Sequence, residues 1–201
     1  MVKQVRFYIE GDTKKMGSGS FISLRQGFNE FFSKWAEQEN LKITFHSVLC
    51  GDRGKAVNFF LNDAPLYAND LVVLLIDTER EKDEAENAKL FLQKDFPNSD
   101  FKKVEDWQCQ FMAQSMESWF LADREKLAAC YDNKFNENAL PKHNKVERIP
   151  KNEVIEKLKV ATKETSNGKG RYDKGESAGK ILRACLEIQE RSAETVKLFL
   201  Q

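Results

Sequence analysis

The sequence of 201 residues is poor in the features that mark several classes of protein. It has only two histidines and four cysteines, and no two cysteines form a Cys-x-x-Cys pair. This scarcity argues against a zinc site and against a disulfide framework in a chain of this size. We therefore expect the cysteines to be buried reduced thiols, which act as small core hydrophobes. They are Cys50, Cys109, Cys130 and Cys185.

An excess of charge of one sign is also absent, because Lys plus Arg and Asp plus Glu number 32 each. No global field indicates nucleic acid, so any phosphate-binding surface has to be local. No apolar run approaches the roughly 20 residues needed to cross a bilayer, and residues 1–10 lack the apolar core of a secretory signal. We expect a cytoplasmic protein with no membrane-spanning segment.

The sequence does contain an alternation of strand and helix patterns over its first two thirds. Strands are predicted at residues 4–10, 42–49, 70–77 and 107–113, and helices at 20–39, after the turn at 51–54, at 86–96 and at 116–131, the last capped by Ser115. Because residues 70–77 are a continuous apolar run, we expect them inside a sheet that is covered on both faces. The predicted fold is α/β, with a mainly parallel sheet of about four strands flanked by helices.

The pattern changes near Asn133, where the strand signals stop. We predict an α/β domain at residues 1–133 and a basic helical C-terminal extension at 134–201 that packs on it, with helices at 152–162 and within 177–200. Between Lys142 and Arg183 the chain has 12 Lys and Arg against 6 Asp and Glu. A charge run of this kind is as readily a solvated helical surface as a binding face.

Three acidic residues follow predicted strands. Glu10 ends the first strand, and Asp77 and Glu79 end the third. Ligands of open parallel sheets bind at this edge, and carboxylates gathered there repel one another unless a cation lies between them. Oxygen ligands without His or Cys favour Mg²⁺ over zinc. The alternative is that each acid is a cap, turn or surface charge.

Four basic residues are candidates for binding a phosphate. Arg53 begins a helix just after a strand, where helix N–H groups and a guanidinium can hold a phosphate together. Arg25 lies on the first helix, where a surface role is equally open. Lys174, in a loop after Tyr172, is the best candidate for reaching a scissile phosphate from the tail, and a surface loop is the alternative. Residues 175–180 have a P-loop-like composition with the wrong spacing, so we reject a nucleotide site there and keep Lys180 as a candidate phosphate contact.

At its acidic positions the sequence resembles the TOPRIM domain of topoisomerases, primases and overcoming-lysogenisation-defect nucleases. The family's Glu-Gly after the first strand matches Glu10-Gly11, and its later Asp-x-Asp matches Asp77-Thr78-Glu79, with Glu in place of the second Asp. Over nearly its whole length the chain is similar to a bacterial TOPRIM-like family, the domain of unknown function 4276 type, which is often encoded beside an ABC-type ATPase in phage-defence loci. Further matching stretches are Leu24-Arg25-x-Gly27-Phe28, Cys50-Gly51-Asp52-Arg53, residues 114–123, Ile149-Pro150-Lys151 and Tyr172-x-Lys174.

The resemblance implies a Mg²⁺- or Mn²⁺-dependent phosphodiesterase, a nuclease acting on DNA or RNA as the effector of a phage-defence or abortive-infection system together with the ATPase. It adds Glu117 as a further metal or water-positioning carboxylate beside Glu10, Asp77 and Glu79. The alternative is a non-catalytic regulatory subunit whose degenerate TOPRIM site binds the partner ATPase. Topoisomerase-like strand passage is disfavoured, because no nucleophile domain or primase zinc module is present in 201 residues.

Overall fold

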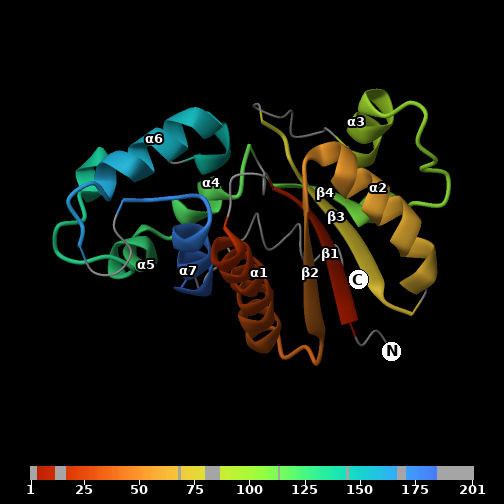
Figure 1. Ribbon diagram of the computed structural model, residues 1–201, viewed down its shortest axis with the longest axis horizontal. Helices are drawn as coiled ribbons and strands as arrows, with labels where there is room; N and C mark the ends of the chain where they lie inside the picture. The colour runs from red at the N-terminus through yellow and green to blue at the C-terminus, as the bar shows by residue number, and fades with distance from the viewer. Residues whose placement is uncertain are drawn as a thin grey trace.

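The computed structural model describes residues 4–11, 17–67, 69–79, 87–112, 114–143, 145–166 and 171–184. Its centre is a four-stranded sheet in the order β2-β1-β3-β4, and every pair of neighbours is parallel (Figure 1). The strands are β1 (Gln4–Glu10), β2 (Thr44–Gly51), β3 (Leu71–Asp77) and β4 (Cys109–Met112). The predicted α/β fold with a parallel sheet is confirmed.

Helices cover both faces of this sheet. The α-helices are α1 (Ser18–Gln38), α2 (Arg53–Asp63), α3 (Ala88–Asp95), α4 (Glu117–Phe120), α5 (Arg124–Ala129), α6 (Lys151–Ala161) and α7 (Glu176–Ala184), and the 3-10 helices are η1 (Ala64–Tyr67), η2 (Asp106–Gln108), η3 (Glu137–Ala139) and η4 (Val146–Arg148). Successive strand residues face opposite sides: Phe7 and Ile9 pack with α1, whereas Tyr8 packs with α2 and α3. None of the described helices is long and apolar enough to cross a membrane.

Strand β3 lies between β1 and β4, as its continuous apolar run predicts. Five of its seven residues, Val72–Ile76, are at most 3% exposed. They alternate between the hydrophobic cluster on the α1 face of the sheet and the cluster on the α2 and α3 face. Leu75 pairs with Ile9 of β1, so the carboxyl ends of these two strands lie side by side. Because β3 is an interior strand, its last residue, Asp77, lies at the carboxyl edge of the sheet between the ends of β1 and β4.

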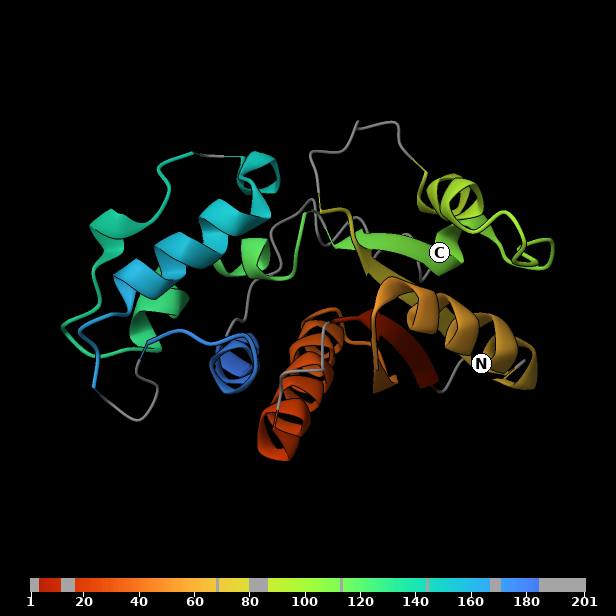
Figure 2. The same cartoon turned by 45° about the horizontal axis from the view of Figure 1, so that its top comes forward.

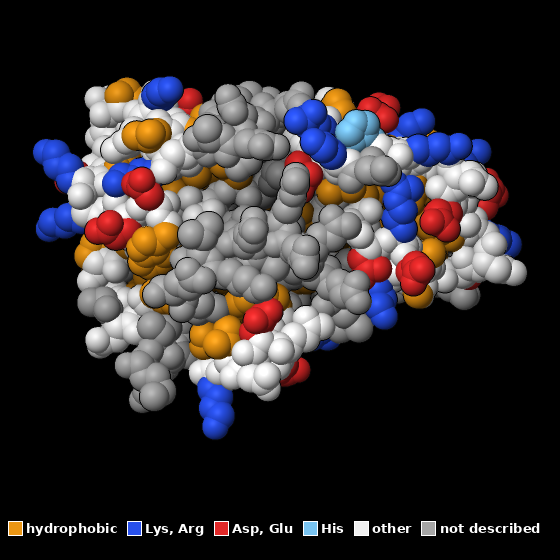
Figure 3. All heavy atoms as spheres, turned by 180° about the vertical axis from the view of Figure 1, so that it is seen from behind, with side chains coloured by type: hydrophobic (Ala, Val, Ile, Leu, Met, Phe, Trp, Pro, Cys, Tyr) orange, Lys and Arg blue, Asp and Glu red, His pale blue; other side chains and the backbone are white. Residues whose placement is uncertain are grey.

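The helical segments after β4 gather on the α1 side of the sheet, away from α2 and α3 (Figure 2). Val146, Ile149 and Val154 belong to the same hydrophobic cluster as Phe28 of α1 and Ile9 of β1. The extension thus shares a core with the sheet, and the boundary at residue 133 stays a prediction. Seen from behind, Lys and Arg side chains are scattered over the half of the molecule that holds α6 (Figure 3).

The prediction of one continuous helix at residues 116–131 is wrong. The chain forms α4 and then α5, because Asp123 leaves the helical conformation (φ −123°, ψ 78°) and its carboxylate accepts a hydrogen bond from the Lys126 N–H. Asp is a strong N-cap residue, so it begins a new helix in place of continuing the old one. The cap of α4 is Met116, not Ser115.

The cysteine prediction agrees with the structure where it can be compared. Cys50, Cys109 and Cys130 are buried as reduced thiols. Burial raises the pKa of the Cys50 and Cys109 thiols to about 12. These two thiols are therefore inert core groups at neutral pH. Cys185, and the predicted helix beyond residue 184, lie outside the described residues.

Helix α7 packs on α1 through glycines that allow the two backbones to approach closely. A Cβ atom added at Gly27 would lie 2.6 Å from the carbonyl oxygen of Gly179, and one added at Gly179 would collide with the backbone carbonyl of Ser23. Backbone atoms cannot rotate away as a flexible side chain can. This crossing therefore needs glycine, and it positions the loop before α7, which carries Lys174, against the rest of the molecule.

We predict that Gly179→Ala lowers the free energy of unfolding by about 2 kcal/mol, because overpacking between helix backbones outweighs the helix propensity that alanine adds. Urea denaturation followed by circular dichroism measures this change. Gly54→Ala in α2 is the matched control, since a Cβ there meets its nearest neighbour at 3.5 Å. The control should be neutral or slightly stabilising, and an equally mild effect at Gly179 would contradict the tight crossing.

Candidate functional site

The candidate site lies where β1 and β3 end. The connection after β1 crosses one face of the sheet through α1 and the connection after β2 crosses the other through α2, so the strand order reverses between β1 and β3. Open α/β sheets bind ligands in the crevice at such a switch point, outside the carboxyl ends of the strands. Glu10 and Asp77 are the last residues of the two strands that flank it.

Glu10 is held by Arg53 and by the end of β3. The Arg53 Nε donates to Glu10 Oε2 at 3.0 Å, and the Asp77 N–H donates to the same oxygen at 3.2 Å. A second Arg53 nitrogen, Nη2, donates to the Asp77 carbonyl at 2.7 Å. Burial raises the pKa of Glu10 above its ordinary value, although the Arg53 guanidinium opposes that shift.

Arg53 reaches this position because it is the first residue of α2. Asp52 caps the helix by accepting the Lys55 N–H at 3.0 Å, and the Arg53 guanidinium lies 5.3 Å from the ring centroid of Phe91. Its Nη1 also donates to Asp95 of α3 at 3.2 Å. Arg53 therefore clamps the strand ends to α2 and α3, and its contact with a substrate phosphate stays a prediction.

Asp77 and Glu79 share one lysine. Lys151 Nζ lies 2.9 Å from Asp77 Oδ2 and 3.1 Å from Glu79 Oε1. Burial raises the pKa of Asp77 to about 6, with Lys151 lowering it and the nearby Glu117 carboxylate raising it. The hydrogen bond from Lys151 lowers the pKa of Glu79. The ammonium thus compensates one deeply buried and one more exposed carboxylate.

The loop that carries Glu79 is held in an uncommon backbone conformation. Glu79 has a φ of 56° and Gln114, after β4, has a φ of 48°, both in the left-handed region that non-glycine residues rarely adopt. The two loops hold each other: the Glu79 N–H donates to the Gln114 carbonyl at 3.1 Å, and the Gln114 N–H donates to the Thr78 hydroxyl at 2.8 Å. Backbone strain of this kind collects at functional sites.

Glu117 is fully buried and bound from the C-terminal extension. The Tyr172 hydroxyl donates to Glu117 Oε1 at 3.2 Å, and Lys174 Nζ lies 4.0 Å from the same oxygen. The other oxygen, Glu117 Oε2, has no hydrogen-bond partner among the described residues, and neither has Asp77 Oδ1. Asp77 and Glu117 are thus two buried carboxylates close enough to influence each other, and each has one oxygen that a bound cation could satisfy.

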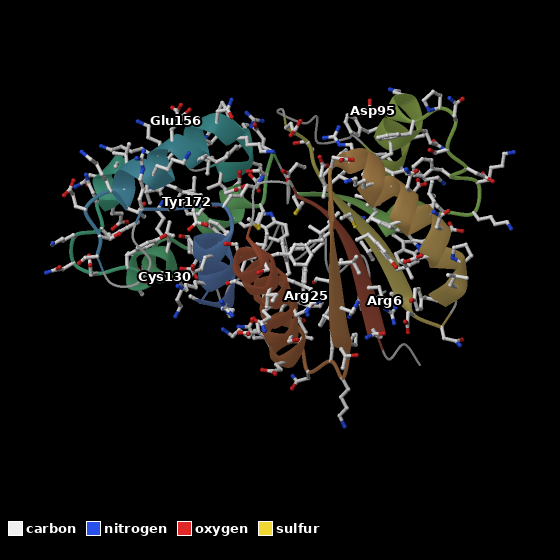
Figure 4. The ribbon with its side chains drawn as sticks, in the orientation of Figure 1. Arg6, Arg25, Asp95, Cys130, Glu156 and Tyr172 are labelled. Carbon is white, nitrogen blue, oxygen red and sulfur yellow. The ribbon has the colours of Figure 1, made fainter. Side chains whose placement is uncertain are left out.

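The four carboxylates divide between the two faces of the sheet edge. Glu10 meets Arg53, which also binds Asp95, on the side of α2 and α3, whereas Asp77 meets Lys151 and lies near Glu117 on the side of the extension. In Figure 4, Asp95 and Tyr172 lie to either side of the upper strand ends. No group of three or more His, Cys, Asp and Glu side chains within the described ranges is close enough to hold a metal ion as they stand.

The donor chemistry nevertheless fits a hard divalent cation. All of the candidate donors are carboxylate oxygens, which Mg²⁺ and Mn²⁺ prefer. Asp77 Oδ1 and Glu117 Oε2 are buried without a partner in the described part of the chain, and a protein cation, Lys151, bridges Asp77 and Glu79. A cation shared by Glu10, Asp77, Glu79 and Glu117 stays a prediction.

Two predicted phosphate contacts lie elsewhere. Arg25 is exposed on α1 and acts electrostatically on His46, the third residue of β2. It therefore lies toward the amino half of the sheet, and in Figure 4 it is level with Arg6. Lys180 forms an ion pair with Glu176 inside α7. Neither residue is brought to the carboxylates by the contacts described here, and their roles stay predictions.

Sequence reasoning did not assign Lys151 or Tyr172 to the site. Lys151 carried a signal, because a positive charge on the first turn of a helix opposes the helix dipole and needs a compensating acid. Tyr172 stands in the matching stretch Tyr172-x-Lys174, but that likeness gave it no role, since a buried tyrosine is an ordinary core residue until its hydroxyl partner is known.

We predict that Asp77→Asn stabilises the metal-free protein above pH 6. The folded-state pKa of about 6 exceeds the ordinary value of 3.8, so folding favours protonated Asp77. Its contribution to stability is present below pH 3.8 and is lost as pH rises through 6. Asparagine removes that loss, which is on the order of 3 kcal/mol for a pKa of about 6 against 3.8.

Urea unfolding between pH 4 and pH 8 with a chelator present measures this difference. Glu125→Gln, at an exposed carboxylate of α5, is the control and should leave the pH profile unchanged. An Asp77→Asn variant that is less stable than wild type at pH 7.5 would instead mean that the pair with Lys151 is net stabilising.

Comparison with known proteins bears on the family of the chain. Residues 10–192 match the family model described as Domain of unknown function (DUF4276). No curated protein and no solved structure matches the sequence. The match covers all of the residues discussed at the candidate site, from Glu10 to Lys180. The chain therefore belongs to the DUF4276 family.

Proposed function

We propose that the protein is a Mg²⁺- or Mn²⁺-dependent phosphodiesterase that cuts nucleic acid, with a fold related to TOPRIM. The observation that carries this proposal is the pair of buried carboxylates, Asp77 and Glu117, each with an oxygen lacking a partner among the described residues. Asp77 ends β3 at the switch point of a parallel sheet, where ligands of such folds bind, and Glu117 of α4 lies near it. Buried carboxylate oxygens without a hydrogen-bond partner are costly, and functional sites are where such cost is retained.

Asp77, Glu79 and Glu117 are the residues that would hold the cation, with Glu10 at the adjoining strand end. When bound, the cation supplies Lewis-acid activation of water and stabilisation of the leaving oxygen. The protein's own groups position it: Tyr172 orients Glu117 through its 3.2 Å hydrogen bond, and Lys174 brings a positive charge to the same carboxylate. Lys174 has 30% of its side chain exposed, which supports its proposed role as a contact for a substrate phosphate.

The biological setting that we propose follows from the family resemblance. The enzyme would act in the cytoplasm as the effector of a phage-defence or abortive-infection system, together with an ABC-type ATPase. The basic residues of the extension support a role in binding the phosphate backbone of DNA or RNA, because Lys and Arg supply most of the sequence-independent affinity for nucleic acid.

A second function is favoured by a different observation. Lys151 already pairs with Asp77 and Glu79, and Arg53 with Glu10, so these three acids have protein counter-ions. A site compensated in this way is also what a non-catalytic regulatory subunit would retain. In that case the surface would bind the partner ATPase without cutting nucleic acid.

The experiment that tests the nuclease is cleavage of single- and double-stranded DNA and RNA with Mg²⁺, Mn²⁺ or a chelator, with and without the partner ATPase. Asp77→Asn and Glu117→Gln should each lower the rate by at least a hundredfold, because each removes a charged ligand from the site. Glu125→Gln is the control carboxylate and should cut like wild type.

Cleavage that persists unchanged in both site variants would reject these acids as catalytic. If wild type, metal and ATPase together give no cleavage of any substrate, the regulatory subunit is favoured. Direct binding of the purified ATPase to wild type and to Asp77→Asn then tests that alternative. A regulatory site does not need the metal, so both proteins should bind the ATPase without it.

A further inference from the structure

Lys151 occupies a particular place in the site. It is the first residue of α6, directly after Pro150, and its ammonium bridges Asp77 Oδ2 at 2.9 Å and Glu79 Oε1 at 3.1 Å. Its side chain is 19% exposed, and that of Asp77 is 5% exposed. One positive charge therefore lies between two carboxylates that are two residues apart, Asp77 at the end of β3 and Glu79 in the loop that follows.

This bridge uses oxygens that a divalent cation would need. A Mg²⁺ or Mn²⁺ ion bound by Asp77 and Glu79 would lie close to the Lys151 ammonium, and two positive charges at such a separation repel strongly when partly buried. Asp77 Oδ1 and Glu117 Oε2 are the buried oxygens left without a partner in the described ranges. The ammonium of Lys151 thus binds one oxygen each of Asp77 and Glu79, whereas Asp77 Oδ1 and Glu117 Oε2 have no hydrogen-bond partner in the described part of the chain.

We propose that Lys151 is a tethered counter-cation, which competes with the divalent cation for Asp77 and Glu79 and so sets the cation concentration at which the site is filled. This inference rests on the proposed function, because it concerns the affinity of the same site. The competition is intramolecular, so the local concentration of the ammonium is high and constant.

The geometry also explains how the ammonium withdraws. Lysine carries its charge on a flexible four-carbon stem and is a compact, strongly hydrated ion, so it can leave the carboxylates without moving the backbone of α6. The Val154 N–H still bonds the Pro150 carbonyl at 3.0 Å in the first turn of that helix. The helix therefore remains a fixed anchor from which the side chain swings.

The first test is Mn²⁺ binding to the full chain, measured from the electron paramagnetic resonance signal of free Mn²⁺. Lys151→Gln should bind Mn²⁺ about tenfold more tightly than wild type, because the competing charge is gone. Lys157→Gln, two turns along α6 at an exposed position, removes the same charge and should bind like wild type. Lys151→Arg keeps the charge and should not tighten binding.

A second test needs no variant at Lys151. In wild-type protein, mass spectrometry after brief acetylation should show Lys151 reacting faster when Mg²⁺ is present, because the cation releases its ammonium. Lys157 provides the internal reference and should react at the same rate in both conditions.

The outcomes separate this inference from the proposed function. If Asp77→Asn abolishes Mn²⁺ binding but Lys151→Gln binds no more tightly than wild type, or if Mg²⁺ leaves the acetylation of Lys151 unchanged, Lys151 is not a competitor although the metal site stands. If neither wild type nor Lys151→Gln binds Mn²⁺, the metal-dependent function fails together with the inference.

Discussion

The burial of one carboxylate, that of Asp77, governs the arrangement of the site. Asp77 ends the interior strand β3 and is only 3% exposed, so its charge must be compensated within the protein or neutralised by a proton. The compensating ammonium comes from Lys151, 74 residues further along the chain. The contact therefore ties the first helix turn of α6 to the end of the sheet, and it gives the extension an electrostatic anchor beside its shared hydrophobic core.

The same constraint explains why the acids separate onto two sides. Strand residues alternate in direction, so Glu10 and Asp77 leave the edge toward different helices although their strands are neighbours. Arg53 compensates the first and Lys151 the second, and the two halves meet where the Glu10 carboxylate accepts the Asp77 N–H. The end of β3 thereby joins the two halves of the site.

The fold could be predicted from the sequence because its signals are local. The apolar run before Asp77 can lie only inside a covered sheet, and the placement of Glu10 and Asp77 at one edge follows from parallel strands. The pairing of Lys151 and Tyr172 with the acids of the site could not be predicted, because their partners lie 74 and 55 residues away along the chain. The helix dipole at Lys151 indicates that an acid is needed there, but it does not indicate which one. The break at Asp123 was missed because the helical spacing of apolar residues continues across it. The new helix begins there because of one capping hydrogen bond, from the Lys126 N–H to the Asp123 carboxylate.

The charge balance of the site bears on what it binds. Asp95 shares Arg53 with Glu10, so together with Asp77, Glu79 and Glu117 five carboxylates face the three cations Arg53, Lys151 and Lys174, and the fully ionised network carries a net charge of −2. On the proposed function, one divalent cation makes that balance less negative, whether Lys151 stays in place or withdraws. A phosphodiester carries a single negative charge, so the metal-free network repels it more strongly than the filled one does. Binding of the cation and of a phosphate group should therefore reinforce each other, which is the behaviour that a metal-dependent phosphodiesterase requires of its substrate site.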